Sequence, residues 1–110
     1  MSEVIKHNSK LWERKNGSDS YFLFWCPGCG HAHSYQVPRW TFNGNHEKPS
    51  FTPSLRIFTP AYDYGNGPQP ERTCCHLYVT DGELRYCGDC PHDHNGKTVP
   101  MQDIPADYGF

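Results

Sequence analysis

The chain has 110 residues, a formal net charge of −2, and only 18 residues that are Leu, Ile, Val or Phe. This length predicts one domain over residues 1–110, and the ten Lys and Arg residues form no basic stripe, which argues against nucleic-acid binding. A core so poor in aliphatic side chains needs a disulfide or metal staple, and the aromatic residues, 15% of the chain, supply part of the missing burial.

The first ten residues contain no apolar run typical of a signal peptide, and no stretch of the sequence is long enough to span a membrane. We therefore expect a cytoplasmic protein of a bacterial cell, without a membrane partner. In such a reducing compartment, the six cysteines favour metal ligation over disulfides.

The ten prolines and ten glycines favour turns and short strands over long helices. Residues 4–12 predict a short strand or a docked arm, and residues 16–20 predict a turn. The apolar run 21–25 predicts a buried strand, and 33–37 predicts its antiparallel return strand, which ends before Pro38. The expected fold is all-β or β-rich, made of small zinc-stapled antiparallel hairpins that resemble a zinc ribbon, with long ordered loops.

Between these two strands lies Cys26-Pro27-Gly28-Cys29. Two cysteines separated by Pro and Gly form a turn that directs both sulfur atoms to one point, as tetrahedral Zn²⁺ requires. We expect this turn to supply half of a structural zinc site. The other half must come from the cysteines and histidines of residues 74–94.

The middle of the chain predicts loops. Residues 38–54 are polar, aromatic and rich in proline, which makes poor core material but is typical of an ordered functional loop. Residues 55–58 predict a short strand. Residues 60–73 are the most loop-like stretch, and we expect them to be the most mobile.

Residues 74–90 predict a hairpin, because Asp81-Gly82 is a two-residue turn signal between alternating strands. This turn pairs Thr80 with Glu83 and places His76 opposite Cys87. Strand alternation then divides the side chains between two faces. The inward face carries Cys75, Leu77, Val79, Leu84, Tyr86 and Cys90, whereas His76, Tyr78, Arg85 and Cys87 lie on the other face.

Two ligand sets compete for the zinc ion. The hairpin register favours Cys26, Cys29, Cys75 and Cys90, while a ribbon-like pair of CxxC motifs would use Cys87 in place of Cys75. Cys74 is expected to lie outside the site. The residues that we expect to orient the thiolates, or to replace one of them as a ligand, are His33, His76, Cys87 and His92.

The ordered motifs CPGC-G-x-H, W-x-FNGN, TPS, CH-x-x-V-x-DG-x-L and DC-x-H lie within residues 24–101. Together they resemble a small family of uncharacterised bacterial and phage proteins, some of them encoded near ubiquitin-like conjugation enzymes. The resemblance implies a zinc site, and it places an apolar residue where this chain has Cys87, which favours Cys75 as the ligand. The positions that coincide with the family's Cys and His residues are Cys26, Cys29, His33, Cys75, His76, Cys90 and His92.

We predict a binding module rather than an enzyme, and no catalytic residues. Four thiolates would close the zinc site to substrate, and adjacent strand residues such as Cys75 and His76 face opposite sides, so they cannot form a Cys–His pair. The expected partner is a protein or a small anionic ligand. The predicted surface is Trp40, Phe42, Asn43, Asn45, His46 and Lys48, with Ser50 and Thr52 adding hydroxyl groups.

Three functions remain open at this point. A phage-encoded modulator or inhibitor of a host defence factor would act through the predicted surface. A zinc-dependent hydrolase or an accessory of a ubiquitin-like conjugation pathway is the first alternative, and a nucleotide-capture protein is the second.

Overall fold

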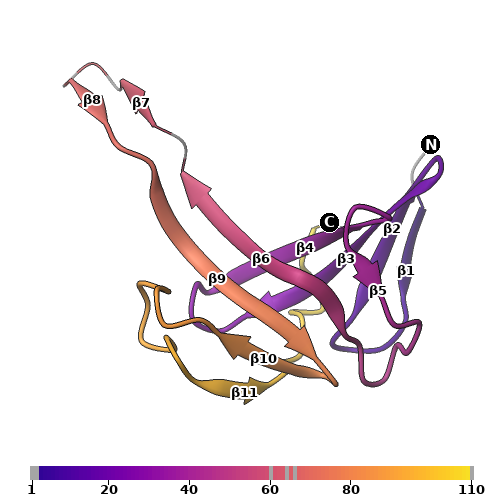
Figure 1. Cartoon of the computed structure of the whole chain (residues 1–110). Helices are drawn as coiled ribbons and strands as arrows, with labels where there is room; N and C mark the ends of the chain where they lie inside the picture. Colours follow the sequence, from indigo (N-terminus) through magenta and orange to yellow (C-terminus); the bar gives the residue numbers. More distant parts are fainter. Residues whose placement is uncertain (1–2, 60, 64, 66, 110) are drawn as a thin grey trace.

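The computed structural model describes residues 3–59, 61–63, 65 and 67–109, and these residues form strands, turns and loops without a helix (Figure 1). The prediction of an all-β fold built from antiparallel hairpins is confirmed. The first sheet is a meander in the order β1-β2-β3-β4. Its strands are β1 (Glu3–Lys6), β2 (Trp12–Asn16), β3 (Asp19–Cys26) and β4 (His31–Val37).

The second sheet has the order β11-β10-β9-β6-β5, and a separate two-stranded ribbon pairs β7 with β8. Figure 1 shows β6 and β9 as a long hairpin that crosses in front of the first sheet. These strands are β5 (Thr41–Phe42), β6 (Phe51–Thr59), β7 (Tyr62–Asp63), β8 (Pro68–Gln69), β9 (Arg72–Thr80), β10 (Glu83–Tyr86) and β11 (Thr98–Pro100).

The core lies between the two sheets and is largely aromatic. Tyr35 of β4 stacks on Phe51 of β6, with ring centroids 4.4 Å apart and planes inclined by 6°. Phe22 packs against the same Phe51 at 5.5 Å. Large rings therefore replace the aliphatic side chains that the chain lacks, as its composition predicts. On the other face of the first sheet, Trp12, Leu23 and Ile104 form a smaller cluster.

The hairpin predicted for residues 74–90 is confirmed in its register. Thr80 pairs with Glu83 and Leu77 with Tyr86, and the Cys87 N–H donates to the carbonyl of His76 at 2.9 Å. The inward face is buried as predicted, with Cys75, Leu77, Val79, Leu84, Tyr86 and Cys90 each at most 5% exposed.

The loop predictions were partly wrong. Residues 38–54 contain β5 and the beginning of β6, and Phe51, which we placed in poor core material, is 1% exposed. The predicted strand 55–58 begins earlier, because Phe51 pairs with Val79 of β9. Of the two alternatives for residues 4–12, the short strand is present as β1, and the range ends at the first residue of β2.

Residues 60–73, predicted as a loop, include β7, β8 and the first residues of β9, because the β6–β9 hairpin continues beyond the body of the protein. Residues 60, 64 and 66 lie outside the described residues. In the part of the chain that the structure describes, no helix is long and apolar enough to cross a membrane.

Candidate functional site

A β-bulge in β6 positions the first residue of the candidate site. Phe51 pairs with Val79 and Leu55 pairs with Leu77, so three residues of β6 face one residue of β9. Pro53 is tolerated there because a bulge does not require its missing N–H, and bulges commonly redirect side chains beside active sites. The indole N–H of Trp40 donates to the Ser54 carbonyl at 3.3 Å and thereby holds the bulge.

The bulge brings Ser54 to His76 of β9. Ser54 Oγ lies 3.0 Å from His76 Nε2, and His76 Nδ1 lies 2.9 Å and 3.1 Å from the two carboxylate oxygens of Asp89. With its proton on Nδ1, the imidazole donates to Asp89 and its Nε2 accepts from the Ser54 hydroxyl. A hydroxyl, an imidazole and a carboxylate in this order form the triad that activates a serine for attack on a carbonyl carbon.

The turn after β10 places Asp89. The Cys90 N–H donates to the Cys87 carbonyl at 3.2 Å, and the Gly96 N–H donates to the same carbonyl at 3.3 Å. The side chain of His76 is 24% exposed and that of Asp89 is 59% exposed, so both groups are accessible from solvent. Because Asp89 is exposed, water weakens its attraction to His76.

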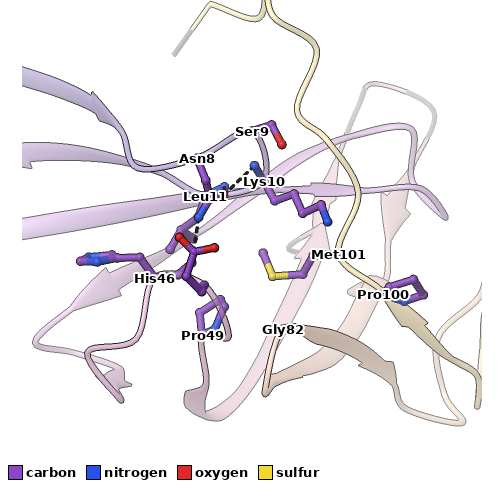
Figure 2. Close-up of a pocket in the computed structure, with 10 residues that line it drawn as sticks. Asn8, Ser9, Lys10, Leu11, His46, Pro49, Gly82, Pro100 and Met101 are labelled. Carbon is purple, nitrogen blue, oxygen red and sulfur yellow. Dashed lines mark hydrogen bonds between the residues drawn. The ribbon is translucent and has the colours of Figure 1, made fainter.

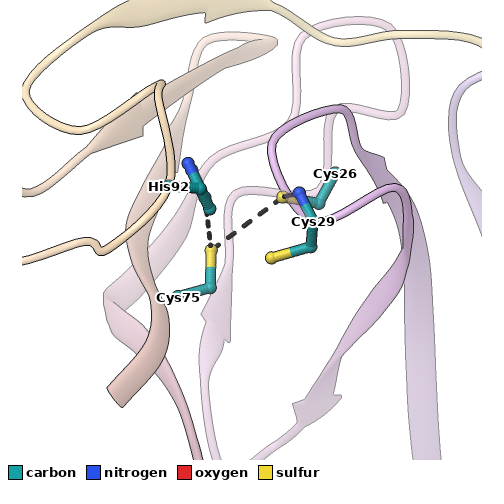
Figure 3. A group of neighbouring side chains, drawn as sticks. All are labelled: Cys26, Cys29, Cys75 and His92. Carbon is teal, nitrogen blue, oxygen red and sulfur yellow. Dashed lines mark hydrogen bonds between the residues drawn. The ribbon is translucent and has the colours of Figure 1, made fainter.

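A second cluster lies on the other face of β9. Cys26, Cys29, Cys75 and His92 each direct one ligand atom into a space where all four atoms lie within 4.8 Å of one another (Figure 3). Cys26 Sγ is 3.9 Å from Cys75 Sγ, which is 3.5 Å from His92 Nε2. These separations are about those of ligands bound 2.0–2.3 Å from one tetrahedral ion, so the cluster is a candidate metal site.

Cys90 extends this cluster. Its sulfur lies 3.9 Å from Cys75 Sγ and 3.1 Å from His92 Nε2, beside two of the four converging donors. The tight group includes His92, which we expected to be an orienting residue or an alternative ligand, and not the predicted Cys90. A Cβ atom on Gly28 would come within 2.3 Å of the His92 ring, so only glycine lets the turn approach it.

The thiols of this cluster differ in acidity. The hydrogen bond with Cys75 lowers the pKa of Cys26 far below that of a thiol in water, with smaller contributions from His33 and Tyr86. Burial raises the pKa of Cys29, and the negative charge of Cys26 adds to this effect. A metal ion would remove this imbalance, because it stabilises every thiolate that it binds.

Of the predicted orienting residues, His33 is 5% exposed and lowers the pKa of Cys26. His76 and Cys87 form a different group of possible ligands with Asp89, and neither is among the four converging donors. Burial raises the pKa of Cys87, and Asp89 raises it further.

The predicted binding surface is largely used by the protein itself. Trp40 and Phe42 pack against the core, and Phe42 stacks on Phe51 at 4.9 Å. Asn43 donates to the Lys48 carbonyl, and the side-chain oxygen of Asn45 accepts from the Lys48 N–H. These amide groups fix the path of the loop. That the loop binds a partner stays a prediction.

His46, the remaining residue of that surface, lines a pocket of about 180 Å³ together with Lys10, Glu47 and Met101 (Figure 2). Its ring stacks on that of His7 at 3.8 Å with planes inclined by 14°, and His7 Nε2 donates to a carboxylate oxygen of Glu13 at 2.7 Å. A ring nitrogen binds a metal in the plane of its ring, so two stacked rings do not converge on one ion. The contacts among His46, His7 and Glu13 hold the loop that contains His46 against β2.

Sequence reasoning missed the serine of the triad. The predicted hairpin already placed His76 on the outward face beside Cys87, and Asp89 follows two residues later. Ser54 lay in a predicted loop, and its pairing depends on the bulge that contains Pro53. A signal was present in the sequence, since a proline inside a strand-forming segment indicates a bulge or an edge.

A comparison with protein families matches residues 1–87 to a family described as the bacterial ubiquitination-like system serine protease, BubE. The matched range contains Ser54 and His76 and ends two residues before Asp89. Neither the curated proteins nor the solved structures give a significant match.

Proposed function

Because the chain belongs to the BubE family, we propose that it is a serine protease of a bacterial ubiquitination-like system, with Ser54 as nucleophile, His76 as general base and Asp89 as the carboxylate that orients His76. The observation that carries this proposal is the continuous chain of hydrogen bonds from Ser54 through His76 to Asp89. This proposal differs from our expectation of a binding module without catalytic residues.

The chemistry follows from the distances. His76 Nε2 takes the hydroxyl proton as Ser54 Oγ attacks the carbonyl carbon, and the imidazolium then gives that proton to the leaving group. Water attacks the resulting acyl-serine in the same manner and restores the enzyme. Asp89 keeps the proton on Nδ1 and stabilises the imidazolium.

The substrate that we propose is the ubiquitin-like protein of the same system. Such a protein is joined to its target through a carboxyl group, so its removal or maturation requires cleavage of an acyl bond. This gives the predicted protein partner a chemical role. The finer predictions of a phage origin and of an inhibitor of host defence stay predictions.

For the second cluster we propose Zn²⁺ as a structural ion. Three thiolates and one imidazole are a ligand set that zinc prefers, and four protein ligands leave no open position for substrate. The ion would join the turn at Cys26 and Cys29 to β9 and to the segment that follows Asp89. Its role is therefore to hold the triad in place, not to act on the substrate.

A fluorophosphonate probe tests the proposed nucleophile, because it forms a bond only with a serine that a neighbouring base has activated. We expect mass spectrometry to locate one label on Ser54 and none in Ser54→Ala. Ser50→Ala is the matched control, since among the described residues the Ser50 hydroxyl hydrogen-bonds to Asp81 and to no histidine. A chain that holds its metal and stays unlabelled would contradict the proposal.

Trp40 is expected to act as a positioning residue. Trp40→Phe keeps a ring beside Tyr35 but removes the hydrogen bond to the Ser54 carbonyl. A neutral hydrogen bond contributes about 0.5–1.5 kcal/mol, so we expect kcat to fall about twofold to tenfold while KM stays the same. Steady-state kinetics on a folded, metal-loaded variant measure this split. A change in KM alone would show that Trp40 contacts the substrate instead.

A further inference from the structure

Cys87 has no role in the triad, yet its sulfur lies beside two of the three triad residues. His76, Cys87 and Asp89 each offer one ligand atom, and these atoms lie within 4.8 Å of one another. An imidazole, a thiol and a carboxylate are all zinc ligands, and this set is separate from the thiol cluster behind β9.

The backbone holds these three groups in place before any ion arrives. The Cys87 N–H donates to the His76 carbonyl, and the Cys87 carbonyl accepts from the N–H groups of Cys90 and Gly96. Both carboxylate oxygens of Asp89 already face His76 Nδ1. The exposure of His76 and Asp89 leaves a path from solvent to the group.

We propose that His76, Cys87 and Asp89 form an inhibitory site for a second zinc ion. The proposal rests on the proposed function for its effect on activity, but the binding of the ion does not. Zn²⁺ with one thiolate and one carboxylate forms an electrically neutral site, and a water molecule completes its four ligands.

The inhibition follows from the two nitrogens of one imidazole. The ion binds Nδ1, whose proton moves by way of water to Nε2, and the Cys87 thiol releases its own proton to water. The neutral ring then carries its proton on Nε2, and this N–H donates to Ser54 Oγ. In the active tautomer the same nitrogen has no proton and accepts one from the Ser54 hydroxyl. His76 can no longer act as a base. Removal of the ion restores the active tautomer.

The test is a titration of the full chain, already loaded with its structural ion, with ZnCl₂ against a chromophoric chelator. We expect a second equivalent to bind the parent protein and Cys74→Ala, a control for a thiol outside the group. In Cys87→Ala the affinity for the second equivalent should fall by more than about 100-fold. Loss of a residue that only hydrogen-bonds to a metal ligand lowers the affinity by about 10–100-fold, and loss of a ligand should lower it further. Mg²⁺ should not compete, because it prefers oxygen ligands.

A Co²⁺ titration provides a spectroscopic readout. The second equivalent should add a thiolate-to-cobalt absorption band that Cys87→Ala lacks. An unchanged second equivalent in Cys87→Ala, or none in the parent protein, would overturn the proposal.

Labelling of Ser54 by the fluorophosphonate separates the two proposals. We expect the second equivalent of zinc to slow labelling of the parent protein at least tenfold and to leave Cys87→Ala unaffected. If zinc binding requires Cys87 but no variant is labelled, the proposed protease activity is refuted and the proposed zinc site is supported. Labelling that zinc does not slow would refute the inhibitory role and keep the protease.

Discussion

Ser54→Ala is expected to reduce kcat on an ester or peptide of the ubiquitin-like protein's C-terminal residues by about 10⁴-fold or more, because loss of a triad nucleophile leaves only binding and oxyanion stabilisation. His76→Ala should cost about as much, and the double variant no more than either single variant, since the two residues act as one unit.

Asp89→Asn should reduce kcat less than Ser54→Ala or His76→Ala does. The carboxylate is 59% exposed, so water can partly replace it in orienting His76. Each variant must keep its metal content and its near-ultraviolet circular dichroism, which reports the packed aromatic core. A Ser54→Ala variant with the parental kcat would refute the triad.

Removal of the structural metal is expected to have the largest effect on stability. Binding of zinc to a structural site contributes about 10–16 kcal/mol, which is as large as the whole free energy of unfolding of a typical domain, about 5–15 kcal/mol. We therefore expect Cys26→Ser and Cys75→Ser to be largely unfolded and without metal. Cys74→Ser, which alters the neighbouring cysteine, should melt within a few degrees of the parent protein.

The same experiment decides the fourth ligand. The sequence favours Cys90, whereas the atoms that converge within 4.8 Å include His92. Elemental analysis of Cys90→Ser and His92→Ala will show which one loses the ion. If Cys26→Ser kept one equivalent of metal and the parental melting temperature, the cluster would not be a structural metal site.

Local chemistry made part of the fold predictable. Asp81-Gly82 requires a two-residue turn, and with the turn fixed the alternation of Cys75 and His76 follows. The turn at Cys26 was equally predictable, because Pro and Gly between two cysteines strongly favour a tight turn. In both cases the deciding residues lie within a few positions of one another.

The serine was not predictable in this way, since His76 and Asp89 lie 22 and 35 positions further along the chain. The three residues of β6 that face one residue of β9 shift the register by an amount that no local pattern specifies. Trp40 posed a similar difficulty. Its indole packs inward and holds Ser54, although an aromatic ring in a polar loop is equally typical of an exposed binding surface.

The adjacent residues Cys75 and His76 have a consequence for how this chain can change in length. A strand that loses or gains one residue turns every following side chain to its other face. One deletion early in β9 would expose the thiol and bury the imidazole, ending metal binding and hydrolysis together, whereas a substitution can end either alone. Homologous chains should therefore differ in length at exposed turns such as Gly17-Ser18, and keep β9 free of insertions and deletions.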